Sequence, residues 1–224
     1  MMKKKLCIFD LDGTLLNTIK DLGGACNYAL QQFGFPQHAI EEYPHFVGNG
    51  VSKLIERALP EGHKDEETVI KVKRVFAEYY IDHCTEKTEP YPGIAALLSS
   101  LKKEGCKLAV ASNKFQTATD KIIRFYFPDT FDTILGEGPN PRKPDPKMLI
   151  DIMQQNNCNP ASTIHIGDSL TDIGAARAAG INVIACTWGF APREIILAEQ
   201  PDYKAENADE IKDLLLNPSP IFPQ

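Results

Sequence analysis

The chain has 224 residues, of which 43% are hydrophobic and 24% are charged, and its net charge is −6 at pH 7. This length allows one or two domains with a substantial core, and the composition is that of a soluble globular protein. The net negative charge argues against broad binding to nucleic acid or to an anionic membrane. No apolar segment approaches the ~20 residues of a membrane span, and the first apolar run is too short for a signal peptide. We therefore expect a cytoplasmic protein.

The six cysteines are scattered along the chain without C-x-x-C spacing. Such a pattern favours neither a disulfide framework nor a zinc site, and we expect reduced thiols. Nothing in the composition decides between a monomer and a homodimer.

Two carboxylates directly follow the first apolar run, which predicts a buried strand over residues 4–9. Open α/β sheets bind ligands at the carboxyl edge, and residues two apart in an extended chain point the same way. Asp10 and Asp12 can therefore converge. At ~4 Å, two carboxylates repel by about 4 kcal/mol at an effective dielectric of 20. The pair needs a shared proton, a cation or a metal; the alternative interpretation is a plain Asp-Gly turn after a strand.

Residues 17–88 show helical periodicity throughout. Apolar residues recur at threes and fours in segments near 17–33, 51–59 and 66–83, and no convincing strand is predicted between 17 and 88. An all-helical insertion of this length is predicted to be a domain of its own.

Strands and helices alternate from residue 90 onward, which predicts an α/β fold with a mostly parallel, Rossmann-like sheet. The first strand belongs to the same sheet. The predicted core domain therefore comprises residues 1–16 and 89–224, and the helical domain 17–88 interrupts it. Strands are predicted at 107–111, 133–135, 163–166, 182–186 and 202–204, and helices near 93–104, 115–126, 145–156, 170–179 and 207–216.

Polar residues follow three further predicted strand ends. Ser112 and Asn113 can seat phosphate oxygens beside a helix N-terminus, although such residues are also ordinary helix caps. Lys143 lies in a proline-rich loop, where it can neutralise an acid pair or simply face solvent. Asp168 and Asp172 can supply carboxylates to a hard cation such as Mg²⁺, or cap a helix.

Together these segments resemble the haloacid dehalogenase superfamily of phosphohydrolases. The resemblance covers essentially the whole chain: D-x-D-G-T at 10–14, S-N at 112–113, K-P-D-P at 143–146 and G-D-S-x-x-D at 167–172. It implies that the helical insertion is a mobile cap. It also implies that Asp10 is the nucleophile that becomes an aspartyl-phosphate and that Asp12 is the general acid and base.

The resemblance implies a role for the downstream motifs as well. Ser112 and Asn113 would hold the phosphoryl oxygens, and Lys143 would orient Asp10 and offset charge. The implied cofactor is Mg²⁺, with ligands from Asp10, the backbone carbonyl of Asp12, Asp168 and, in support, Asp172. A second aspartate two residues after the nucleophile favours phosphoryl transfer, since an alkoxide leaving group needs acid help.

The cap segment suggests which phosphate is cleaved, because it resembles that of phosphoglycolate phosphatases. A Gly-flanked loop ending at Gly50 can approach a small substrate, and Lys53 or Arg57 can meet its carboxylate or remain exposed helix charges. Lys114 and residues 187–189 are further candidates for the pocket entrance. We therefore expect a small phosphorylated metabolite as the partner.

The favoured interpretation is a Mg²⁺-dependent phosphatase for a small phosphomonoester, 2-phosphoglycolate first among them. A pyrophosphatase or a sugar or nucleotide phosphatase would share K-P-D-P, and a phosphomutase would keep all four motifs. A non-catalytic relative is disfavoured because Asp10, Asp12, Lys143 and Asp168 are all present.

Overall fold

The computed structural model describes residues 5–138 and 141–217. Residues 1–4, 139–140 and 218–224 lie outside the described residues, and with them the first residue of the predicted strand 4–9 and both outer ends of the predicted core segments.

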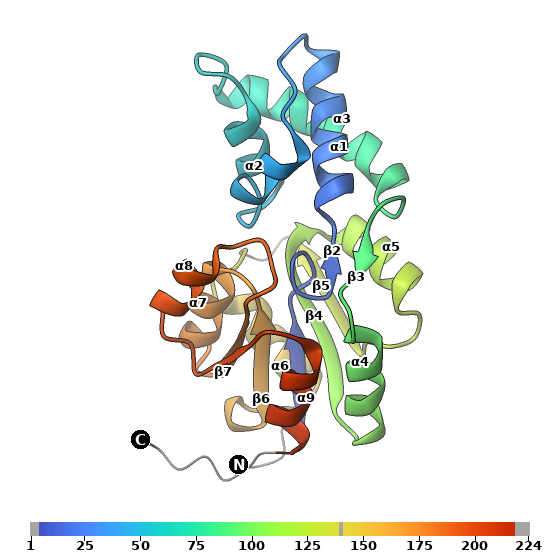
Figure 1. Cartoon of the computed structure of the whole chain (residues 1–224), viewed down its shortest axis with the longest axis vertical. Helices are drawn as coiled ribbons and strands as arrows, with labels where there is room; N and C mark the ends of the chain where they lie inside the picture. The colour runs from blue at the N-terminus through green and yellow to red at the C-terminus, as the bar shows by residue number, and fades with distance from the viewer. Residues whose placement is uncertain (1–4, 139–140, 218–224) are drawn as a thin grey trace.

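A six-stranded sheet forms the centre of the larger part of the molecule (Figure 1). Its strand order is β5-β4-β1-β6-β7-β8, and every neighbouring pair is parallel. The first strand of the chain is therefore central, as an α/β fold with a Rossmann-like sheet requires, and the predicted fold class is confirmed. The strands are β1 Leu6–Phe9, β4 Lys107–Phe115, β5 Thr133–Glu137, β6 Thr163–Gly167, β7 Asn182–Cys186 and β8 Tyr203–Ala205.

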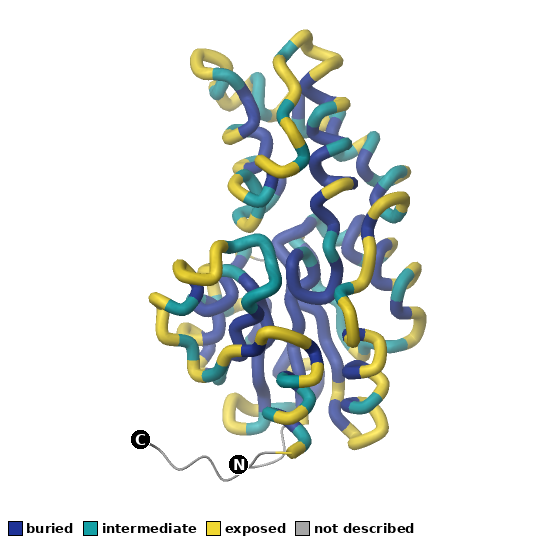
Figure 2. The backbone as a smooth tube through the Cα atoms, viewed as in Figure 1, coloured by how far each residue is buried: buried dark blue, intermediate teal, exposed yellow. Residues whose placement is uncertain are grey.

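Helices cover both faces of this sheet, and the inner strands β4, β1, β6 and β7 are mostly buried, whereas the edge strands β5 and β8 are partly exposed (Figure 2). Alternate residues of β1 point to opposite faces: Phe9 belongs to the hydrophobic cluster that includes residues of α4, α5 and α9, whereas Ile8 belongs to the cluster that includes residues of α6, α7 and α8. Because helices cover both faces of the sheet, the strands need apolar residues on both sides and therefore consist of near-continuous apolar runs. The helices are α4 Ile94–Lys103, α5 Gln116–Tyr126, α6 Lys147–Gln155, α7 Leu170–Ala178, α8 Arg193–Ala198 and α9 Ala208–Leu216.

The remaining helices pack on one another above the carboxyl edge of the sheet (Figure 1). They are α1 Ile19–Gln32, the 3₁₀ helix η1 Ile40–His45, α2 Val51–Ala58 and α3 Glu66–His83, and we call them together the helical bundle. Among the helices of residues 5–138 and 141–217, none is long and apolar enough to cross a membrane.

Several short elements depart from the sequence prediction. Asn17 belongs to a two-residue strand, β2 Leu16–Asn17, that pairs antiparallel with β3 Glu89–Pro90, so the expectation of no strand from residue 17 to 88 was wrong at its first residue. Helices η1 and α8 and the 3₁₀ turn η2 Pro160–Ser162 were not predicted either. These elements are too short to show a hydrophobic period.

The two chain segments that join the bundle to the sheet are tied together by one buried acid. Asp21, in the first turn of α1, accepts hydrogen bonds from the backbone N–H groups of Lys87 and Thr88 at 2.9–3.0 Å and from Thr88 Oγ1 at 2.8 Å. Together with the β2–β3 pair, this contact fixes the point where the bundle leaves and rejoins the core.

We expect Asp21→Ala to lower the free energy of unfolding by about 1–3 kcal/mol, because it leaves the buried N–H and hydroxyl of Thr88 and the part-buried N–H of Lys87 without their acceptor. Chemical denaturation measures the effect, with Asp82→Ala on the exposed side of α3 as the control. An unchanged unfolding midpoint for Asp21→Ala would contradict the structural role of this contact.

Candidate active site

A cavity of about 420 Å³ lies between the carboxyl edge of the sheet and the helical bundle. Among the described residues predicted for the site, Lys53, Asp172 and residues 187–189 are not part of its wall. The others line it from both sides: Asp10, Asp12, Gly50, Arg57, Ser112, Asn113, Lys114, Lys143 and Asp168.

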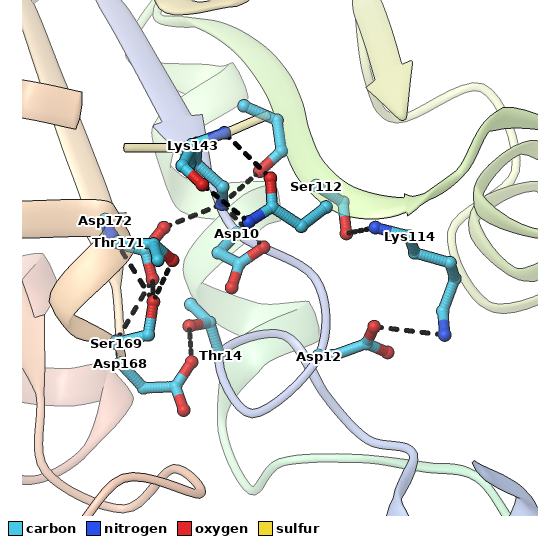
Figure 3. Close-up of polar contacts among 12 residues, drawn as sticks. Asp10, Asp12, Thr14, Ser112, Lys114, Lys143, Asp168, Ser169, Thr171 and Asp172 are labelled. Atoms are coloured by element: carbon cyan, nitrogen blue, oxygen red, sulfur yellow. Dashed lines mark hydrogen bonds and ion pairs between the residues drawn. The ribbon is translucent and has the colours of Figure 1, made fainter. Parts of the chain in front are cut away.

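One lysine links two of the predicted acids at the floor of the cavity (Figure 3). Lys143 Nζ lies 2.9 Å from Asp10 Oδ1 and 2.7 Å from Asp172 Oδ1, and it also donates to the carbonyl oxygen of Ala111 at 2.6 Å. The lysine is 3% exposed. All three donors of the ammonium are thus used, and its charge is held between the two carboxylates.

The pKa values of this cluster follow from burial and mutual charge. Burial raises the pKa of Asp10 well above its ordinary value, Asp172 adds to this, and Lys143 opposes it. Burial lowers the pKa of Lys143, but Asp10 and Asp172 raise it more, so the net shift is upward. Burial also raises the pKa of Asp172, yet Lys143 and His165 outweigh this and hold it well below its usual range. Asp172 is therefore the permanent anion that holds Lys143 in place.

Asp168 occupies the opposite side of the cluster. Thr14 Oγ1 donates to its Oδ1 and the backbone N–H of Phe190 to its Oδ2, each at 2.8 Å. Burial raises the pKa of Asp168 to about 7, and the charge of Asp172 contributes. This acid is thus poised to lose a proton near neutral pH when a cation approaches.

The acids Asp10, Asp168 and Asp172 fit a divalent cation. One carboxylate oxygen from each lies within 4.8 Å of the others. Both oxygens of Asp172 already accept hydrogen bonds, from Lys143 and from Ser169. We therefore infer that Asp10 and Asp168 would hold the ion directly, with Asp172 behind them. Oxygen ligands of this number suit Mg²⁺, which keeps several waters.

Three glycines make room for these acids. A Cβ at Gly13 or at Gly189 would collide with the carboxylate of Asp168, and a Cβ at Gly167 would collide with that of Asp172. Gly13 has a φ of +87°, a conformation that glycine adopts at little cost. The glycines of both acidic motifs therefore serve the placement of the acids, and Gly189 is the member of the predicted 187–189 segment that contributes directly.

Asp12 points away from this cluster. Thr18 Oγ1 donates to its Oδ1 at 2.6 Å, and Lys114 Nζ lies 3.0 Å from its Oδ2 (Figure 3). Its carboxylate is thus separate from the acids that fit a cation, which leaves its backbone carbonyl as the group for the predicted metal contact. The side chains of Asp10 and Asp12 therefore do not converge as predicted, because the extended strand ends at Phe9 and the chain bends at Leu11.

The two residues predicted to bind phosphate have different surroundings. Ser112 Oγ accepts from the backbone N–H of Lys114 at 3.2 Å and keeps its own proton for another acceptor. The side chain of Asn113 accepts from the backbone N–H of Lys143 at 2.9 Å and donates to its carbonyl oxygen at 3.0 Å. Asn113 thus secures the loop that carries Lys143.

The three predicted cap residues are also placed differently. Arg57 lines the cavity, and its guanidinium donates to the carbonyl oxygens of Phe46 and Val47 and to Asn49 Oδ1, so it orders the loop before Gly50. At Gly50, a Cβ would collide with the side chain of Arg142 from the core. Lys53 is not brought to the cavity: it is half-exposed and pairs with Glu56.

Sequence reasoning did not find His165, a buried residue of β6. Its Nε2 lies 2.9 Å from Asp172 Oδ1 and its Nδ1 lies 3.0 Å from the carbonyl oxygen of Ile8. Burial lowers its pKa, although the contact with Asp172 opposes this. A single histidine in an apolar strand carries no signal of such a contact.

Trp188, from the predicted 187–189 segment, is a packing residue near the site. Its indole N–H donates to the carbonyl oxygen of Thr14 at 3.2 Å.

Comparison with known proteins gives consistent matches. The family model for "Haloacid dehalogenase-like hydrolase" matches residues 7–186. A phosphoglycolate phosphatase from Psychrobacter arcticus is 34% identical over 98% of this chain and 99% of its own length. The crystal structure of a predicted phosphoglycolate phosphatase from Haemophilus somnus is 30% identical, with a TM-score of 0.87 over 96% of this chain and 99% of that one. A crystal structure from Lactobacillus delbrueckii subsp. bulgaricus is 34% identical, with a TM-score of 0.90 over 96% and 99%.

We expect Mg²⁺ to raise the melting temperature more at pH 8 than at pH 6. Because the pKa of Asp168 is about 7 in the folded protein and 3.8 in an unfolded chain, the cation-free fold binds the extra proton between these values. Its stability therefore falls as pH rises through that window. A cation must displace this proton, so it stabilises more where the proton is already lost. Thermal unfolding with and without Mg²⁺ measures this effect.

Asp168→Asn is expected to remove most of the Mg²⁺ effect, whereas the exposed control Asp82→Asn retains it. Equal increments at both pH values, or an undiminished increment in Asp168→Asn, would exclude Asp168 as a ligand.

Proposed function

Because the chain belongs to the haloacid dehalogenase-like hydrolase family and is a phosphoglycolate phosphatase-like phosphoric monoester hydrolase, we propose that it is a Mg²⁺-dependent phosphatase whose preferred substrate is 2-phosphoglycolate. The observation that carries this proposal is the division of the acids: Asp10 pairs with buried Lys143 and belongs to the cation-fitting cluster, whereas Asp12 lies apart from it. Such a division suits one acid that attacks and another that moves protons.

In the first step, Asp10 Oδ attacks the phosphorus atom. The bond between phosphorus and the ester oxygen breaks, Asp12 gives its proton to the departing oxygen, and an aspartyl-phosphate remains. Lys143 orients Asp10 and offsets the charge of the transferring group. Bound Mg²⁺ would supply charge neutralisation between the carboxylate nucleophile and the phosphate dianion. The side chain of Ser112 is free to donate to a phosphoryl oxygen.

In the second step, water attacks the phosphorus atom of the aspartyl-phosphate. Asp12, now ionised, takes the proton of the water, and the bond between phosphorus and Asp10 breaks. Inorganic phosphate leaves and both acids return to their starting states. This scheme requires that Asp12 face the side of the leaving group, and its separation from the Asp10 cluster supports that requirement.

We further propose that residues 17–88 act as a cap domain on a core made of residues 1–16 and 89–224, and that the cap selects the substrate. The cavity lies between the two parts, which supports a closing movement around a small ligand. Arg57 of the proposed cap lines this cavity, and it orders the loop before Gly50, which faces the proposed phosphate-binding residues. Phosphoglycolate phosphatase is also the name that the relatives from Psychrobacter arcticus and Pseudomonas putida carry.

We expect Asp10→Asn to lower phosphate release by at least about 10³-fold, since an amide cannot form the covalent intermediate. Phosphate release from 2-phosphoglycolate with Mg²⁺ measures the loss, circular dichroism checks the fold, and Asp209→Asn on an exposed helix turn is the control. Activity within a few-fold of the unsubstituted protein would rule out the covalent scheme.

We expect Arg57→Ala to lower kcat/KM for 2-phosphoglycolate by roughly 10-fold, and for 4-nitrophenyl phosphate by much less, because charge-assisted contacts to a carboxylate are worth about 1.5–3 kcal/mol. Lys53→Ala, one turn away and outside the cavity, is the matched control and should leave both values unchanged. Equal losses on both substrates would remove Arg57 from substrate selection.

A further inference from the structure

Lys114 is a buried cation to which the catalytic scheme gives no role. It belongs to β4, two residues after Ser112, and is 4% exposed. Its ammonium lies 3.0 Å from Asp12 Oδ2 and donates to the hydroxyl of Tyr80 at 2.9 Å. It also lies 4.6 Å from the centre of the Tyr80 ring. Burying an ammonium is costly unless it is paired, and here both partners are specific.

Tyr80 belongs to α3, so it comes from the helical bundle and not from the core. Its ring is fully buried and is held by Phe76 of the same helix and Phe115 of β4, at centroid distances of 5.3 and 6.1 Å. Burial raises the pKa of Tyr80 well above its ordinary value, which keeps the hydroxyl neutral. The contact therefore joins the bundle to the core through a rigid aromatic side chain and one lysine.

The carboxylate of Asp12 has two partners with different origins. Thr18, the residue that precedes α1, donates a hydrogen bond to one oxygen of this carboxylate. Lys114 of β4 forms an ion pair with the other oxygen. Asp12 itself is only partly buried, and its side chain is 21% exposed. Without Lys114 the carboxylate would keep one hydrogen bond and could rotate toward solvent. Its direction in the cavity therefore depends on the lysine.

We propose that Lys114 is a positioning residue: it orients the carboxylate of Asp12 toward the leaving group. Through its contact with Lys114, Tyr80 makes this orientation depend on how the helical bundle packs against the core. This role rests on the proposed function, in which Asp12 is the acid and base. It requires no contact between Lys114 and the substrate.

The test compares two substrates of nearly the same shape, phenyl phosphate and 4-nitrophenyl phosphate, in single-turnover release of the phenol. The nitrophenolate leaves without a proton, whereas the phenolate depends on acid help. We expect Lys114→Met to slow release from phenyl phosphate roughly 10- to 100-fold, the cost of a misplaced catalytic group, and release from 4-nitrophenyl phosphate at most a few-fold. Tyr80→Phe should show the same selectivity with a smaller loss.

The control is Lys121→Met. Lys121 also joins the core to α3, through a hydrogen bond to the carbonyl oxygen of Ile81, but it is exposed and outside the cavity. It should leave both rates unchanged. Thermal unfolding of each variant separates a loss of fold from a loss of positioning.

Asp12→Asn, measured in parallel, tests the proposed function separately from the positioning role of Lys114. If it shows the leaving-group selectivity and Lys114→Met does not, the positioning role is wrong and the proposed function stands. If Asp12→Asn shows no selectivity, both are wrong. A raised KM for 2-phosphoglycolate in Lys114→Met, with unchanged single-turnover rates, would make Lys114 a substrate contact and overturn the proposal.

Discussion

The site depends on one buried ammonium placed among carboxylates. Lys143 contacts Asp10 and Asp172 at once, and its third donor is used by the carbonyl oxygen of Ala111, so the group has no freedom to move. At an effective dielectric of 20, each contact of this length is worth several kcal/mol of Coulomb attraction before desolvation. Removal of the lysine would leave buried acids unpaired, which costs far more than the loss of an exposed pair. The position of the Asp10 carboxylate, the proposed nucleophile, therefore follows from the position of Lys143.

The fold supplies that position through the carboxyl edge of a parallel sheet. β1, β4 and β6 are adjacent, and each delivers polar residues to the same edge as it ends. Glycine at positions 13, 167 and 189 leaves space that a side chain would take from Asp168 and Asp172. Because β1 and β6 are neighbouring parallel strands, the acids that follow them come within 4.8 Å of one another, and the polar residues of β4 lie beside them. The order of the strands in the sheet thus determines which polar side chains meet at the site.

This constraint also explains what the sequence could predict. Periodicity and strand ends identify the fold class, the helix Glu66–His83 and the meeting of Asp10 with Lys143 and Asp168, because each depends on local pattern and on a general rule of parallel sheets. Contacts between segments far apart in the chain left no local signal: Asp21 with Thr88, His165 with Ile8, and Lys114 with Tyr80. Helical spacing alone likewise could not separate Arg57, which lines the cavity, from Lys53, which does not.

The charges around the cavity support a requirement for a divalent cation. Four acids, Asp10, Asp12, Asp168 and Asp172, surround the sheet edge, and the buried lysines of residues 5–138 and 141–217 are two, Lys114 and Lys143. If all the acids were ionised, a phosphate dianion would approach an already negative site. Burial raises the pKa values of Asp10 and Asp168, which reflects the electrostatic cost of holding these carboxylates close together. A cation bound by Asp10 and Asp168 would offset this cost and, at the same time, the charge of an approaching phosphate dianion.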